Sequence, residues 1–240
     1  MTRVAVCLPT FNEAENVGAM LDAVLGVFDD NGIDGRILVI DDASPDGTAA
    51  IVEERAREEP RVAVLRRARK EGLGRAYRDG FRRVLDDGAD VVVQMDCDFS
   101  HDPSAIPSLL AALDDADFAL GSRYVRGGGV VGWPLLRQAI SKGGCWYARI
   151  LLGIPVQDLT GGFKAWQSAV LEYLLGRSID ARGYGFQIQM TYEAMLAGYR
   201  VREIPIVFHE RVRGESKMSV DVVREAAIMV PRLRLAARRR

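Results

Sequence analysis

Short apolar runs alternate with longer amphipathic segments over the first half of the chain. The runs have four or five residues rich in valine, isoleucine and leucine, as is typical of buried strands. They are Val4 to Leu8, Arg36 to Ile40, Val62 to Leu65, Val91 to Met95 and Phe118 to Gly121. Helical spacing of apolar residues is found around 14–28, 47–58, 73–87 and 104–113. This alternation predicts an α/β domain with a mostly parallel central sheet and helices on both faces.

The pattern loosens after about residue 122. Gly127-Gly128-Gly129 predicts a flexible segment, and 134–152 predicts a helix in which apolar and basic positions are mixed. A last helix and strand are expected at about 185–197 and 201–207. The tail from Ser219 is expected to be helical, with Pro231 either interrupting the helix or starting a further turn.

Composition narrows the class of protein. The 240 residues are 48% hydrophobic and carry 32 basic and 33 acidic side chains, which suits one large domain and argues against a general nucleic-acid binder. Cys7, Cys97 and Cys145 are odd in number and lie in apolar surroundings, as expected in a reducing cytosol. No apolar stretch approaches the roughly 18 residues of a membrane span. A soluble or peripherally attached protein is expected.

Two aspartates follow the fourth expected strand. In an extended segment, Asp96 and Asp98 project to the same face, with Cys97 between them. Ligands bind at the carboxyl ends of strands in an α/β sheet, and two carboxylates can bind one hard divalent cation, which in turn can bind a diphosphate. For the tripeptide alone, a short acidic turn that ends a strand is the more common interpretation.

Polar residues also follow the first two strands. Pro9 to Glu13 comes after the first strand, and Asp41-Asp42 ends the second. Ser44 and Asp46 can cap the next helix, whereas Asp42 can accept a hydrogen bond from a base or ribose. Exposed loop acids are common, so a purely structural role is the alternative. Three strand ends are nevertheless expected to converge at one edge of the sheet.

The glycines of Gly72 to Tyr77 lack the third glycine of a dinucleotide fingerprint and follow no strand, so we reject a nicotinamide enzyme.

Motifs along nearly the whole chain resemble one family. They are Leu8-Pro9-Thr10-Phe11-Asn12-Glu13, Asp41 to Thr48, Asp96-Cys97-Asp98-Phe99-Ser100-His101, Gly121-Ser122-Arg123-Tyr124, Asp158 to Phe163 and Arg211 to Lys217. The sequence resembles the dolichol-phosphate mannosyltransferases, or polyprenol monophosphomannose synthases, of glycosyltransferase family 2. The resemblance implies a single GT-A type, Rossmann-like catalytic domain over 1–218, with a nucleotide-sugar and metal half (1–121) and an acceptor half (122–218). A basic helical tail would follow at 219–240.

The resemblance also assigns roles to residues. It places Pro9, Phe11, Glu13, Ile40 and Asp42 at the guanosine of GDP-mannose, although Phe11 stands where the family usually has tyrosine. Around Mg²⁺ or Mn²⁺ and the diphosphate it places Asp96, the backbone of Cys97, Asp98 and Ser100, with Asp96, Asp98 and Ser100 as metal ligands. Arg182, Arg211 and Lys217 also belong to the donor side. For the lipid phosphate it assigns Arg123, Arg137 and Ser141. The catalytic set is Asp98, Arg123, Arg211 and Lys217.

A polyprenyl phosphate acceptor explains why no base is needed. A phosphomonoester is largely dianionic at pH 7 and can attack the anomeric carbon directly. Polysaccharide synthases of the same superfamily need a carboxylate base and typically carry Gln-x-x-Arg-Trp, but here no arginine precedes Trp133, Trp146 or Trp166. We therefore expect single-displacement, inverting transfer in which the metal and the Lys and Arg side chains stabilise the departing GDP.

The C-terminal end of the sequence is strongly basic. Nine basic and three acidic residues lie between Arg211 and Arg240. This excess predicts that the tail docks on an anionic leaflet, with a solvated charged helix as the alternative. The resemblance implies a peripheral enzyme on the cytoplasmic face of a membrane, in some relatives with a separate membrane-anchoring protein.

Two other functions remain open. One is a polyprenyl-phosphate glucosyltransferase that uses UDP-glucose, although the segment from Gly127 to Trp133 resembles the mannosyl branch. The other is a noncatalytic nucleotide-sugar-binding subunit, which the intact acidic and basic motifs disfavour.

Overall fold

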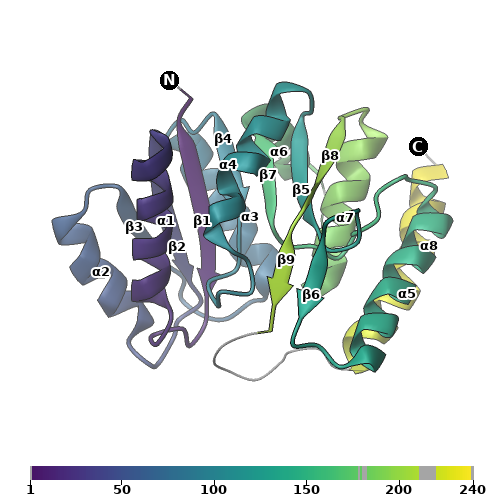
Figure 1. The fold of residues 1–240 in the computed structure, drawn as a ribbon, viewed down its shortest axis with the longest axis horizontal. Coiled ribbons are helices and arrows are strands. Elements are labelled where there is room, and N and C mark those ends of the chain that lie inside the picture. The colour runs from purple at the N-terminus through teal and green to yellow at the C-terminus, as the bar shows by residue number, and fades with distance from the viewer. Residues whose placement is uncertain (1, 178, 180–182, 211–219, 239–240) are drawn as a thin grey trace.

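The computed structural model describes residues 2–177, 179, 183–210 and 220–238, without the side chains of 183–184, 220–227 and 238. In this part of the chain a seven-stranded sheet has the order β3-β2-β1-β4-β7-β5-β8 (Figure 1). Its strands are β1 (Val4–Thr10), β2 (Gly35–Asp41), β3 (Val62–Arg66), β4 (Val91–Gln94), β5 (Phe118–Ser122), β7 (Lys164–Gln167) and β8 (Val201–Pro205). The five predicted strands of the first half are confirmed within about two residues at each end.

Helices cover both faces of the sheet, as predicted. They are α1 (Val17–Asn31), α2 (Thr48–Glu58), α3 (Leu73–Asp86), α4 (Ile106–Ala111), α5 (Leu135–Leu152), α6 (Ser168–Leu175), α7 (Gly183–Leu196) and α8 (Val220–Arg238). Short 3₁₀ turns, η1 (Pro103–Ala105) and η2 (Ala112–Asp114), flank α4. No helix in the described ranges is both long and apolar enough to cross a bilayer.

Alternation along β1 shows how one strand serves both faces. Val4, Val6 and Leu8 pack with α1 and α4, whereas Ala5 and Cys7 pack with α3, α6 and α7. Successive side chains of a strand point to opposite faces, so a continuous apolar run is what a strand buried on both sides requires. This packing holds the carboxyl ends of β1, β2 and β4 together at one edge.

The second half differs from the prediction in three places. β7 was not expected, and it lies antiparallel between β4 and β5. The segment predicted to be flexible contains β6 (Gly129–Val131), which pairs with β9 (Val207–His209). The predicted strand 201–207 is therefore divided between β8 and β9. These strands have only three to five residues and pair with distant segments, so no local periodicity marks them.

The prediction that Pro231 interrupts the last helix or starts a further turn is wrong, since α8 continues through it. A proline inside a helix costs about 3 kcal/mol. Here the neighbouring Val230 is fully buried in a cluster with Ala148 and Leu152 of α5 and Tyr192 of α7. Packing of α8 along α5, visible at one end of Figure 1, offsets that cost.

Candidate functional site

Backbone strain is concentrated at the carboxyl edge of the sheet. Asn12, Ala43 and Phe99 have φ values of 60°, 58° and 59°, and they follow β1, β2 and β4 respectively. Non-glycine residues rarely adopt positive φ, and such strain typically gathers where a binding site constrains the backbone. The three strand ends that were predicted to converge are therefore each followed by a residue with positive φ.

A cavity of about 400 Å³ opens at this edge. It brings together most of the predicted site residues, namely Pro9, Phe11, Glu13, Asp42, Asp96, Cys97, Asp98, Ser100, Arg123 and Arg137. Ile40 does not line the cavity, because its side chain is buried against α3, where a Cβ at Gly80 would overlap it. Ser141, on α5, is not among the residues that line the cavity. The predicted residues Arg182, Arg211 and Lys217 lie outside the described residues.

The loops after β1 and β2 are bonded to each other. Ser44 accepts a hydrogen bond from the backbone of Asn12, and Asp46 accepts from the backbone of Ala14. Asp46 also accepts from the backbone and the hydroxyl of Thr48, at 3.0 and 2.6 Å. The residue that caps α2 is Gly47, and it makes no side-chain capping bond. The expected capping role is therefore wrong for Ser44, whose hydroxyl instead joins the loops after β1 and β2.

Asp42 is held by an arginine that sequence reasoning missed. The side chain of Arg67 is only 6% exposed and pairs through separate nitrogens with Asp42, Glu71 and Asp79. Burial raises the pKa of Asp42, while Arg67 acts in the opposite direction. Nearby, the ammonium of Lys70 lies 3.6 Å from the centre of the Phe11 ring. Arg67 belongs to a run of basic residues that is typical of a solvated loop, so the sequence did not indicate its pairing with Asp42.

Both residues of the acidic pair, Asp96 and Asp98, line the cavity. Asp98 is buried, and its Oδ1 accepts hydrogen bonds from the backbone nitrogen and the hydroxyl of Ser100, at 3.0 and 2.5 Å. The backbone nitrogen of Asp96 donates to Nδ1 of His101, which stacks on Phe163. Burial lowers the pKa of His101. The ring is therefore neutral at pH 7, with its proton on Nε2.

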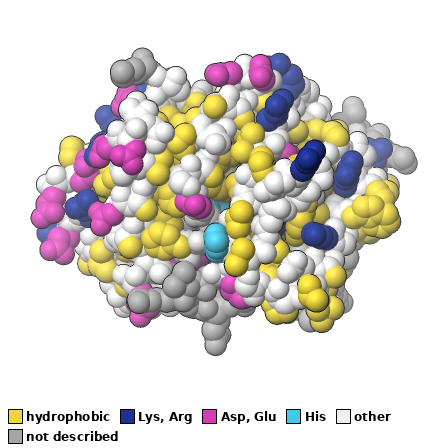
Figure 2. Space-filling view, viewed as in Figure 1, with side chains coloured by type: hydrophobic (Ala, Val, Ile, Leu, Met, Phe, Trp, Pro, Cys, Tyr) yellow, Lys and Arg dark blue, Asp and Glu magenta, His cyan; other side chains and the backbone are white. Residues whose placement is uncertain are grey.

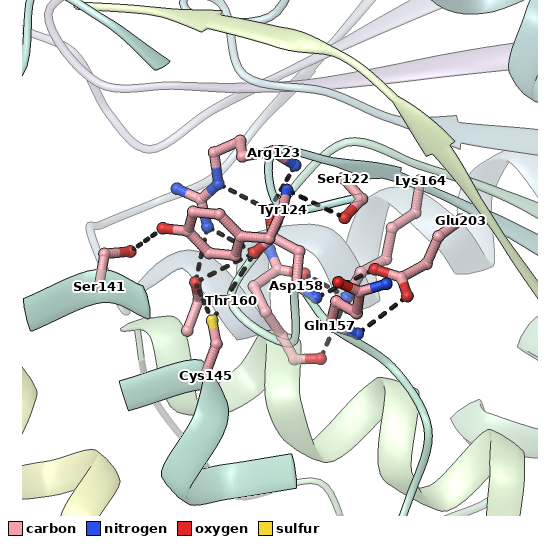
Figure 3. A network of polar contacts seen from close by, with 11 residues as sticks. Ser122, Arg123, Tyr124, Ser141, Cys145, Gln157, Asp158, Thr160, Lys164 and Glu203 are labelled. Carbon is pink, nitrogen blue, oxygen red and sulfur yellow. Dashed lines mark hydrogen bonds and ion pairs between the residues drawn. The ribbon is translucent and has the colours of Figure 1, made fainter. Parts of the chain in front are cut away.

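Arg123, which lines the cavity, belongs to a buried ion pair with Asp158 (Figure 3). Arg123 donates from Nε and Nη2 to the two carboxylate oxygens of Asp158, at 2.7 and 2.6 Å, and its backbone nitrogen donates to the same carboxylate. Nη2 also donates to Thr160. The predicted acceptor residue Ser141 accepts a 2.6 Å bond from the hydroxyl of Tyr124. Asp158 was quoted within a motif but was given no role, and here it fixes the orientation of Arg123.

The second predicted acceptor arginine is also engaged. Arg137 donates to Glu210 at 2.9 Å, and its guanidinium lies 4.1 Å from the centre of the Trp133 ring. Trp133 in turn makes an edge contact with Phe208 of β9. The ring of Trp133, supported by Phe208, and the carboxylate of Glu210 therefore set the position of this side chain in the cavity lining.

Two glutamines and a lysine near the acidic pair are hydrogen-bonded to one another. Lys164 is fully buried and donates to the backbone and side-chain oxygens of Gln187, both at 3.0 Å. Gln94 donates to the same side-chain oxygen at 2.7 Å. With two donors on Oε1, the NH₂ group of Gln187 must face the cavity, which Gln187 lines beside Asp96. The sequence offered no signal for this arrangement.

The chain belongs to glycosyltransferase family 2, whose family model matches residues 5–175. The expected family and the GT-A type of fold are therefore confirmed. An undecaprenyl-phosphate mannosyltransferase from Micrococcus luteus is 46% identical over 236 residues, which cover 98% of this chain and 96% of that protein. A polyprenol monophosphomannose synthase from Mycolicibacterium smegmatis is 44% identical over 237 residues, which cover 95% and 85%.

Solved structures share the fold at lower identity. Glucosyl-3-phosphoglycerate synthase from Mycobacterium tuberculosis, in complex with phosphoglyceric acid, has a TM-score of 0.66 at 20% identity and covers 98% of this chain and 80% of that one. A mannosyltransferase from Pyrobaculum calidifontis, in complex with GDP-Man and Mn²⁺, has a TM-score of 0.62 at 18% identity and covers 98% and 73%. At this identity the likeness establishes the fold alone.

Proposed function

We propose that this protein transfers mannose from GDP-mannose to a polyprenyl phosphate, with inversion at the anomeric carbon. The observation that carries the proposal is one cavity that Asp96 and Asp98 line together with the predicted nucleotide residues and two arginines, Arg123 and Arg137. Similarity over nearly the full chain to two polyprenyl-phosphate mannosyltransferases supports the lipid acceptor and the sugar. The fold is also that of a protein whose structure contains GDP-Man.

The acidic pair suits a divalent cation shared with the donor. Both carboxylates line the cavity, and Asp98 is held in one orientation by Ser100. Among the described residues no group of three or more His, Cys, Asp or Glu side chains could hold an ion. Two carboxylates and a substrate diphosphate are the usual environment of Mg²⁺, and Mn²⁺ accepts the same oxygen ligands. The cation would neutralise charge on the departing nucleotide.

The arginine end suits an anionic acceptor. The pairing with Asp158 fixes Arg123 at the cavity wall, and Arg137 bonds Glu210, a carboxylate that a lipid phosphate can replace. Guanidinium groups match phosphate oxygens in geometry and charge. A largely dianionic phosphate attacks without a protein base, so the protein must only orient the phosphate and stabilise the leaving GDP.

The direct test is transfer by the purified chain. GDP-mannose with a labelled sugar, a short polyprenyl phosphate and Mg²⁺ or Mn²⁺ should yield a labelled lipid. Asp98→Asn can still accept the hydrogen bonds from Ser100 but lacks the charge, so it is expected to lose at least a hundredfold in turnover while its thermal midpoint stays within a few degrees.

Competing donors separate this function from its alternatives. Preferential transfer from UDP-glucose would replace the mannosyl assignment. Nucleotide binding without transfer by the folded chain would instead identify a noncatalytic subunit.

With a lipid acceptor, the enzyme is expected to act as a peripheral protein at the cytoplasmic face of a membrane, where a separate anchoring protein is a further expected partner.

A further inference from the structure

The outer face of α5 is apolar and exposed to solvent. Leu135 and Leu136 are 84% and 73% exposed, and Trp146 and Ile150 are 67% and 58% exposed. Ile140 is also exposed. At 100° per residue these five side chains fall within an arc of roughly 140° on the helix. Large apolar side chains gathered on one exposed face mark an interaction surface.

The opposite face of the same helix belongs to the site. Cys145, Ala148 and Leu152 are buried, and Arg137 and Ser141 lie on the cavity side. One helix therefore separates the proposed phosphate pocket from an apolar outer surface. The inference drawn from this arrangement rests on the proposed function. A polyprenyl phosphate has an anionic head and a long hydrocarbon chain, and the hydrocarbon chain must lie in an apolar medium close to the pocket.

Positive charge borders the apolar arc. Lys142 and Arg149 are exposed along one edge of it, and the sequence of α5 contains no acidic residue. On the neighbouring α8, which packs along α5, Leu235 is 55% exposed and Arg232 is exposed as well. Figure 2 shows hydrophobic side chains at the α5 end of the molecule with Lys and Arg side chains beside them.

We propose that the outer face of α5, formed by Leu135, Leu136, Ile140, Trp146 and Ile150, docks on an anionic lipid bilayer. A helix with an apolar face, a basic edge and an exposed tryptophan fits the interface between headgroups and acyl chains. The basic edge selects an anionic lipid surface over the matching face of a second copy, which would bring like charges together. The exposed Leu235 and Arg232 of α8, which lie within the predicted docking tail 219–240, extend this surface.

Vesicle sedimentation with the full chain tests the proposal. The variant Leu136→Ser/Ile150→Ser should bind vesicles that contain phosphatidylglycerol at least tenfold more weakly than the wild type. The matched control is Ile51→Ser, an exposed isoleucine on α2 at the other end of the sheet, which should bind as the wild type does. Lys142→Gln/Arg149→Gln should weaken binding and reduce its dependence on salt, and vesicles of phosphatidylcholine alone should bind poorly.

Activity in solution separates this proposal from the proposed function. With a short, water-soluble polyprenyl phosphate, the outer-face variant should keep its turnover within twofold of the wild type. Loss of transfer in every form of the protein would overturn the function, whereas unchanged vesicle binding by a folded outer-face variant would overturn the docking surface. Light scattering on the wild type and the outer-face variant tests whether the face binds a second copy of the chain instead. If the wild type is a dimer, the variant is a monomer and vesicle binding is unchanged, the face is a dimer interface.

Discussion

Replacing Lys164 by methionine removes an ammonium group from the interior of the protein. Lys164 is fully buried, and its bonding partners are two oxygens of Gln187, neither of which is charged. Burial lowers the pKa of Lys164 to about 7 from its ordinary value of 10.5, although Asp158 acts in the opposite direction. Methionine has a similar length and no charge, so the variant isolates the effect of the proton.

The magnitude follows from proton linkage. Between pH 7 and pH 10.5 the unfolded chain keeps the proton on Lys164 while the native state releases it. Stability rises with pH wherever the unfolded state binds more protons, by about 1.4 kcal/mol per pH unit for one group. Below pH 7 both states are protonated, and the native state bears the full cost of the buried charge. From pH 6.5 to pH 9 the wild type should gain about 2 to 3 kcal/mol relative to the variant.

Urea unfolding at several pH values measures this gain. The free energy of unfolding of the wild type minus that of Lys164→Met should increase steadily from pH 6.5 to pH 9, because all other groups contribute alike to both proteins. Lys142→Met, at an exposed lysine on α5, provides the control and should give a difference that does not vary with pH.

A constant difference for Lys164→Met over this pH range would refute the reasoning. It would mean that Lys164 stays protonated in the native state and that neutral oxygens suffice to hold its charge. A difference that falls with rising pH would be a stronger contradiction, because it would require the native state to bind the proton more tightly than the unfolded chain does.

Three further predictions concern the site. Asp158→Ala should leave Arg123 buried without its counter-charge, which costs about 3 to 5 kcal/mol of stability. Calorimetry should show a thermal midpoint lower by roughly 10 °C, and an unchanged midpoint would exclude a stabilising role of the ion pair. Glu210→Gln should release Arg137 and lower the KM for polyprenyl phosphate several-fold, with the KM for GDP-mannose as the internal control; an unchanged acceptor KM would show that Glu210 does not compete with the phosphate. Removal of divalent cations with EDTA should abolish transfer, and Mg²⁺ or Mn²⁺ should restore it in the wild type but not in Asp98→Asn; activity that persists in EDTA would contradict the metal role.

Local pattern was sufficient for the first half of the fold. The apolar runs that became β1, β2 and β4 are buried on both faces and separated by amphipathic helices, so their composition alone indicates parallel strands. In a parallel sheet all carboxyl ends lie at one edge. The convergence of Glu13, Asp42 and Asp98 on one cavity therefore followed from the order of strands and loops along the chain.

The second half depended on contacts between distant segments. β7 has four residues and lies between two strands that run opposite to it, and no periodicity of so short a run indicates such a place. Pro231 would end an isolated helix, but burial of Val230 against α5 and α7 keeps α8 intact. In both cases tertiary packing outweighs the local preference.

The sequence by itself determined the family, the class of fold and the residue types that face the cavity, because those are set by local patterns and by contiguous motifs. Only the tertiary structure decided how these residues are held. Arg67 meets Asp42, Asp158 meets Arg123 across 35 positions, and burial beside Gln187 lowers the pKa of Lys164. The energies of buried charges depend on desolvation and on partners brought together by folding, and neither can be seen in a linear chain.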